Sequence, residues 1–154
     1  MMELNEKIKS ALIKMDFVHK YEELSNKFNS DRTPEEELLE YVDRDEVLEI
    51  IEKLGYKASF NSKEKFFAIR EEKIGNFSFG FHIILRYGAV DWGWVAREGN
   101  ELLLGSPWSI YARLLIDPDY RINYPLFGTY EDLDEIFEIG FAMYEEFKKA
   151  VISS

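Results

Sequence analysis

The chain has no cysteine and only two histidines, His19 and His82. The lack of cysteine excludes disulfide bonds, thiolate metal ligands and cysteine nucleophiles, and it is compatible with a reducing compartment. The two histidines lie far apart in sequence and do not show the close spacing of a histidine metal site. We therefore predict a cytoplasmic protein without metal ligands.

Long apolar runs are also missing. The longest purely apolar stretches are only a few residues, such as 83–85 and 102–104, whereas a membrane-spanning helix needs ~20. Acidic residues begin at Glu3, and no small-residue cleavage site follows an apolar stretch near the start. We therefore expect neither a signal peptide nor a membrane-bound protein.

Sequence motifs for several common chemistries do not occur. Glycines are spread one per turn or strand over residues 75–105, so there is no glycine-rich phosphate-binding loop. There is no GxSxG elbow, and residues 43–46 lack the central glycine and terminal glutamate of a calcium loop. We predict no catalytic set and no cofactor.

Basic residues are few: 19 oppose 30 acidic residues, which gives a net charge of −11. The excess lies in the flanks, with −7 in residues 1–55 and −5 in residues 106–154, whereas residues 56–105 carry +1. Direct nucleic-acid binding requires the opposite sign and is not expected. An acidic surface favours a basic protein partner, although the charge also serves solubility alone.

The apolar periodicity predicts helices, then strands, then helices. Helical spacing covers residues 3–28, and a second helix begins at Thr33 and Pro34, restarts at residues 43–46 and ends at Gly55. Residues 56–105 contain about five short strands separated by turns. Ser106 and Pro107 then begin a helix that runs to about residue 115, a short edge strand covers residues 124–128, and Thr129 caps a final helix.

This order predicts the α+β class: one domain over residues 1–154, with N-terminal helices, an antiparallel meander and C-terminal helices. In the central strand, Phe77, Phe79, Phe81, Ile83 and Leu85 form the core face. His82 and Arg86 lie on the other face. If neighbouring strands pair locally, His82 comes near Asp91 or Glu98, and a small hydrolase or isomerase that uses this pair is one alternative function.

Aromatic residues and arginines gather in the second half of the chain. Tryptophan, tyrosine and arginine are enriched at protein interfaces, so the predicted partner-binding residues are Trp92, Trp94, Arg97, Trp108, Tyr111, Tyr120, Arg121 and Tyr124. Aromatic residues also fill protein cores, and the tryptophans fit that role as well. For Tyr120, Arg121 and Tyr124 we find no structural role in the sequence pattern.

The stretch "PWSIYARLLIDPDYRINYPLFGTYEDLDEIF", followed by "MYEEF" after a strand meander, resembles bacterial toxin-immunity proteins. The chain is also similar to these proteins in size and acidity, and the resemblance covers about the C-terminal two-thirds of the chain. It implies a non-catalytic protein that blocks the basic active cleft of a toxin. Secretion-type chaperones share the acidity, length and α+β layout; they are typically dimers, so that alternative includes a homodimer.

Overall fold

Five antiparallel strands form one sheet in the computed structural model, which describes residues 3–153. Each strand pairs with the next one in sequence, so the predicted meander is confirmed. The strands are β1 (Ala58–Asn61), β2 (Phe66–Ile74), β3 (Phe77–Arg86), β4 (Ala89–Glu98) and β5 (Glu101–Leu104).

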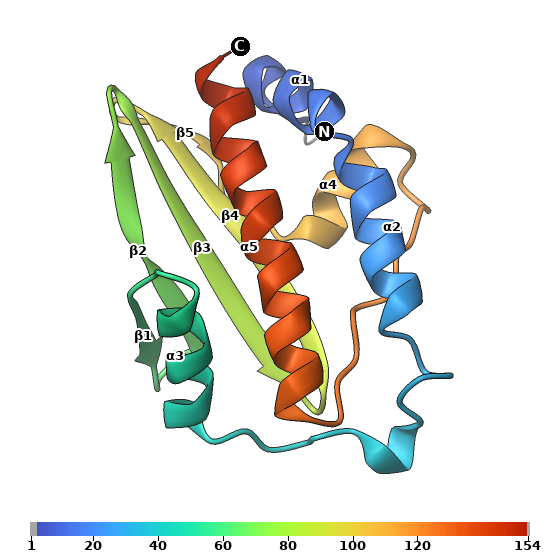
Figure 1. Cartoon of the computed structure of the whole chain (residues 1–154). Coiled ribbons are helices and arrows are strands. Elements are labelled where there is room, and N and C mark those ends of the chain that lie inside the picture. The colour runs from blue at the N-terminus through green and yellow to red at the C-terminus, as the bar shows by residue number, and fades with distance from the viewer. Residues whose placement is uncertain (1–2, 154) are drawn as a thin grey trace.

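Within residues 3–153, five α-helices accompany the sheet, and Figure 1 shows α5 crossing in front of it. The helices are α1 (Glu6–Lys14), α2 (Phe17–Lys27), α3 (Arg44–Lys53), α4 (Trp108–Leu115) and α5 (Tyr130–Ile152). In β3, Phe79, Phe81 and Ile83 are fully buried on the helix side, while His82 and Arg86 are exposed on the other face. The α+β class and the predicted core face are both confirmed.

Residues 3–28 contain two helices, whereas the apolar period predicted one. α1 ends before Met15, and Asp16 adopts the left-handed conformation with a φ of 59°, which Asp tolerates better than most residues. The next residue, Phe17, enters the core, where its ring meets Trp108 edge-on with 5.3 Å between the ring centroids. The break therefore lets two short helices pack in different directions.

The helix predicted from Thr33 is also wrong. Residues Glu35–Glu37 form a single turn of 3-10 helix (η1), after which the chain is extended as far as Asp43. The backbone N–H of Leu39 donates to the carbonyl of Phe127 at 3.1 Å, so tertiary pairing uses a group that an α-helix would need. α3 then begins where the Asp43 carboxylate accepts from the backbone N–H of Asp45 at 2.9 Å.

The connector between α4 and α5 pairs with the start of β4. Leu126 forms a single antiparallel bridge with Ala89, and Val90 N–H donates to the Pro125 carbonyl at 3.0 Å. The short edge strand predicted here is thus present as one bridge. Thr129 caps α5 as predicted, because its hydroxyl accepts from Asp132 N–H at 3.1 Å.

An aromatic cluster fills the space between the sheet and the helices. Trp92 and Trp94 from β4 both pack on Trp108 of α4, with ring centroids 4.5 and 5.0 Å apart. Trp94 also stacks on Phe147 of α5 at 4.5 Å with an interplanar angle of 16°. Such contacts stabilise by about 0.5–1.5 kcal/mol each beyond the burial of area. β4, α4 and α5 are therefore held together by one set of rings.

At Gly140 the backbone of α5 lies directly against a side chain of the sheet. A Cβ atom on this glycine would lie 2.2 Å from the Trp92 ring, which is itself buried. We predict that Gly140→Ala destabilises the fold by about 1–3 kcal/mol, although alanine is the better helix former by about 1 kcal/mol. Urea unfolding measures the change.

The matched control is Ala142→Gly, at an exposed position of the same helix. It removes a methyl group without touching the Trp92 contact and should cost only the helix propensity of about 1 kcal/mol. A stabilising effect of Gly140→Ala would contradict this account of the helix–sheet contact.

Candidate functional site

Four of the predicted partner-binding residues belong to the core. Trp94, Trp108 and Tyr111 are fully buried and Trp92 is 2% exposed. The prediction that they contact a partner is therefore wrong for this conformation, because their side chains pack between the sheet and the helices, against residues of α2 and α5. The structure supports the alternative, in which these aromatic side chains fill the core.

Tyr111 has a specific structural role. Its hydroxyl accepts from the backbone N–H of Trp94 at 2.8 Å and donates to the carbonyl of the same residue at 3.1 Å. These backbone groups lie on the edge of β4, where β5 pairs only with residues 96–98. Tyr111 thus completes the hydrogen bonding of the β4 edge and fixes α4 against it.

The other predicted residues divide between two surfaces. Arg97 is exposed on the face of the sheet opposite the helices. Tyr120, Arg121 and Tyr124 lie in the connector and line a cavity of about 260 Å³ together with Ser109, Arg113, Ile122 and Asn123. The structure therefore brings three of the eight residues together, and we call this cavity the connector pocket.

Of the two acids predicted to act with His82, only Asp91 shares a hollow with it. His82 and Asp91 line one hollow of about 160 Å³ on the open face of the sheet, whereas Glu98 forms an ion pair with Lys7 of α1 at 3.1 Å. Among the described residues, the carboxylate of Asp91 has its only ion-pair contact with Arg86, at 4.0 Å. Burial raises the pKa of Asp91, an effect that Arg86 partly opposes.

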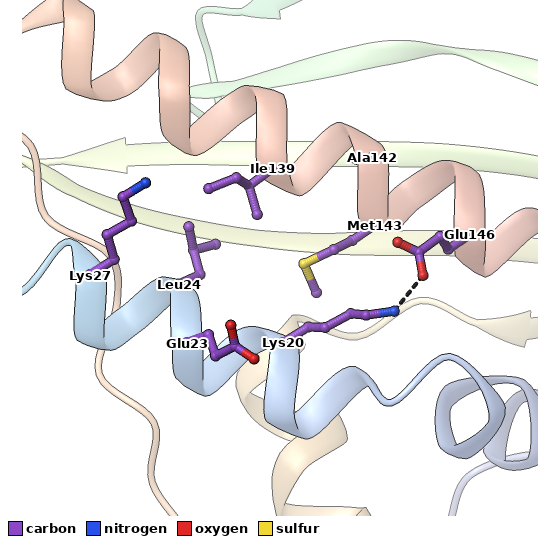
Figure 2. A pocket seen from close by; sticks show the side chains of 8 residues that line it. All are labelled: Lys20, Glu23, Leu24, Lys27, Ile139, Ala142, Met143 and Glu146. Carbon is purple, nitrogen blue, oxygen red and sulfur yellow. Dashed lines mark hydrogen bonds and ion pairs between the residues drawn. The ribbon is translucent and has the colours of Figure 1, made fainter.

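A groove with an apolar floor lies between α2 and α5. Its volume is about 370 Å³, and Leu24, Ile139 and Met143 point toward one another across it (Figure 2). Lys20 pairs with Glu146 at one end, and Lys27 pairs with Glu135 at 2.6 Å. The charged groups at both ends are thus already paired within the protein.

The most strongly charged surface is one that the predicted site residues miss entirely. Residues 35–52 contain nine acidic residues and one basic residue, and all nine acidic side chains are exposed. Figure 1 shows this segment running along one end of the molecule, from η1 past the start of α5 to α3. The acidic residues, which we call the acidic end, are Glu35, Glu36, Glu37, Glu40, Asp43, Asp45, Glu46, Glu49 and Glu52.

The acidic end differs from the rest of the surface in its pairing. Within residues 3–153, Glu49 is the only one of the nine with an ion pair, at 3.8 Å to Lys53. The single basic residue, Arg44, lies over the Phe60 ring at 4.5 Å. Elsewhere, carboxylates such as those of Asp132 and Glu72 pair with Arg32 and Lys148 at 2.9 and 2.6 Å.

Two exposed tyrosines adjoin the acidic end. Tyr41 is 80% exposed and Tyr87 is 67% exposed, and both line a hollow of about 550 Å³ that also includes Glu40 and Glu64. Lys65 and Arg86 line the same hollow, so its own charges balance and the negative field comes from the surrounding acidic end. The density of acids around Tyr41 is the signal in the sequence that could have revealed this surface.

The described residues were also compared with the geometry of metal sites and membrane spans. Within residues 3–153, no group of three or more His, Cys, Asp or Glu side chains is placed to hold a metal ion. No helix in that range is long and apolar enough to cross a membrane. Comparison with protein-family models, curated proteins and solved structures found no match to this chain.

The Tyr111 interaction leads to a stability prediction. Tyr111→Phe keeps the ring but removes the hydroxyl, which leaves the Trp94 N–H and carbonyl on the β4 edge without their partner. We expect a loss of about 1–3 kcal/mol in the free energy of unfolding, measured by chemical denaturation. A loss below about 0.5 kcal/mol would show that the hydroxyl contributes little to holding α4.

His82 supplies a prediction for pH dependence. Partial burial lowers the pKa of His82 below its ordinary value of 6.5. The unfolded state then binds the proton more tightly, so this residue destabilises the fold as the pH falls below 6.5 and has no effect well above it. Histidine NMR titration should give a midpoint below 6.5 for His82, and His82→Gln should flatten this part of the stability profile.

A His82 pKa above its ordinary value would instead support the catalytic alternative. A carboxylate that acts on His82 raises the histidine pKa, so a midpoint above the ordinary value would indicate coupling to Asp91.

Proposed function

We propose that this protein is a protein-binding module that captures a basic protein partner at its acidic end. The observation that carries the proposal is the concentration of nine exposed acidic residues in residues 35–52, of which only Glu49 is ion-paired within the described part of the chain. Opposed charges speed the encounter of two proteins and set their orientation more than they set the final affinity.

Tyr41 and Tyr87 supply the aromatic contacts that surface charges alone do not provide. Binding energy at interfaces concentrates in a few aromatic or arginine side chains, surrounded by contacts that exclude water. A tyrosine face also attracts arginine and lysine through cation–π interaction. An acidic surface that includes two exposed tyrosines therefore matches a partner that presents arginine or lysine.

The finer form of the proposal is a toxin-immunity protein, in which the acidic end covers a cationic cleft of the toxin. A chaperone for an extended client is less well supported. Such a protein needs continuous apolar surface, whereas the exposed Ile13, Leu102 and Ile116 come from α1, β5 and the connector.

The test uses matched charge reversals. Glu40→Lys with Glu46→Lys alters the acidic end, and Glu71→Lys with Glu101→Lys makes the same change in charge at exposed positions of β2 and β5. The tagged protein is used to capture its partner from a lysate of the source organism, and the partner is then purified and its affinity measured at several salt concentrations.

We expect a basic partner whose affinity falls by more than about tenfold with the first pair and by less than about threefold with the control pair, because only the first pair disrupts the complementary surface. Rising salt should weaken the wild-type complex. Equal effects of the two pairs would show that binding depends on the total charge of the protein and not on the acidic end, which would contradict the proposal. Capture of an acidic partner would also refute it.

The tyrosines are tested in the same assay. Tyr41→Ala and Tyr87→Ala should each weaken the complex by about tenfold or more if these side chains act as anchors. Both side chains are exposed, so the melting temperature should change little. Unchanged affinity in both variants would leave the acidic end without its proposed anchors.

A further inference from the structure

The connector pocket contains two arginines that the protein itself does not neutralise. Within residues 3–153, neither Arg113 nor Arg121 has a carboxylate in ion-pair contact, whereas Arg32, Arg86 and several lysines do. Arg44, Arg70 and Arg97 also lack such a contact within that range, but Arg113 and Arg121 are distinguished because they line one cavity together. Both guanidinium groups are therefore available to an anion from outside.

Local hydrogen bonds hold Arg121 in place, and partial burial restricts Arg113. Arg121 donates through Nη1 to the carbonyls of Pro118 and Tyr120 at 2.9 and 3.2 Å, which fixes the side chain against its own loop. Arg113 is half-buried on α4. Its Nε is fully buried and has no acceptor among the described residues, an arrangement that is costly unless a partner is supplied.

The walls of the pocket are aromatic and apolar. Tyr120 and Tyr124 line it together with Ile122, and Tyr120 is held in position because its hydroxyl donates to Glu22 of α2. The cavity of about 260 Å³ is large enough for a single ring or one side chain but small for a larger cofactor.

We propose that the connector pocket binds a monocarboxylate attached to an apolar body. The planar guanidinium fork matches a carboxylate in two parallel hydrogen bonds, and the tyrosines and Ile122 provide a surface for the apolar body. Glu22 accepts a hydrogen bond from the Tyr120 hydroxyl at the wall of the pocket, so its negative charge opposes a second charge on the ligand. A monoanion is therefore favoured over a phosphate dianion.

This proposal is independent of the protein-binding function. The connector pocket lies between α4 and the loop that follows it, whereas the acidic end runs along the end of the molecule that carries η1 and α3 (Figure 1). The two surfaces also select ligands of opposite charge. Charge reversals at the acidic end should leave carboxylate binding intact.

The probe is benzoate, with benzamide as the neutral control of the same shape. Titration into ¹⁵N-labelled protein should shift the backbone resonances of residues 109–113 and 120–124, with a millimolar Kd, as expected for a ligand of this size. Benzamide and inorganic phosphate should each bind at least about tenfold more weakly, because one lacks the charge and the other carries too much.

Substitutions assign the binding to the two arginines. Arg121→Gln and Arg113→Gln should each weaken benzoate binding by about tenfold, while Arg97→Gln, at an exposed arginine of β4, should have no effect. Arg121 is exposed, so its variant stays informative even if Arg113→Gln lowers the melting temperature. Unchanged binding in Arg121→Gln, or equal binding of benzamide, would overturn the proposal.

A second titration distinguishes a free metabolite from the end of a polypeptide. A tripeptide that ends in phenylalanine with a free carboxylate is compared with its C-terminal amide. Tighter binding of the free acid than of benzoate identifies a peptide C-terminus as the source of the carboxylate, and the reverse order identifies a small molecule. If neither ligand shifts the pocket resonances, the proposal fails.

Discussion

The contact between α5 and β4 is the constraint on which the rest of the fold depends. Gly140 lets the helix backbone approach the Trp92 ring, and Phe147 of the same helix stacks on Trp94. Trp108 then brings α4 into the same cluster, and Phe17 brings in α2. A core built of large rings has few alternative packings, because each ring must fit the others in shape as well as in polarity.

Because the tryptophans are buried in the core, other residues form the charged surfaces of the protein. The helical layer pairs many of its charges internally: Lys148 is buried between Glu72 and Glu145, at 2.6 and 2.8 Å, and joins α5 to β2. Burial alone would raise the pKa of Glu145, but hydrogen bonds from Lys148 and Tyr56 outweigh it and lower that pKa. The acidic end has few such partners, so its negative charge faces outward and is available to a partner.

The connector is attached to the rest of the protein at both ends and lines the connector pocket between them. Its second part is tied to β4 through Pro125, and Phe127 ties it to Gly88 in the β3–β4 turn and to Leu39 in the extended segment. Its first part is tied to α2 through Tyr120 and Glu22. Between these attachments Ile122 packs against the core while Arg121, Asn123 and Tyr124 are exposed, and the connector pocket lies beside α4. The pocket is therefore a consequence of anchoring at both ends, and its two arginines give it a charge preference opposite to that of the acidic end.

Local patterns determined much of this protein. Strand alternation and turn residues predicted the five-stranded meander, Thr129 predicted the start of α5, and Gly55, with a φ of 94°, follows α3 as predicted. The break at Asp16, the extended chain after η1 and the burial of Trp92, Trp94, Trp108 and Tyr111 were decided only by tertiary structure. Alternation places Trp92 and Trp94 on one face of a strand, but a helix distant in sequence determines whether that face is covered. In the same way, the sequence contained the acids of residues 35–52, but only the fold places η1, the extended segment paired with Phe127, and α3 along one end of the molecule.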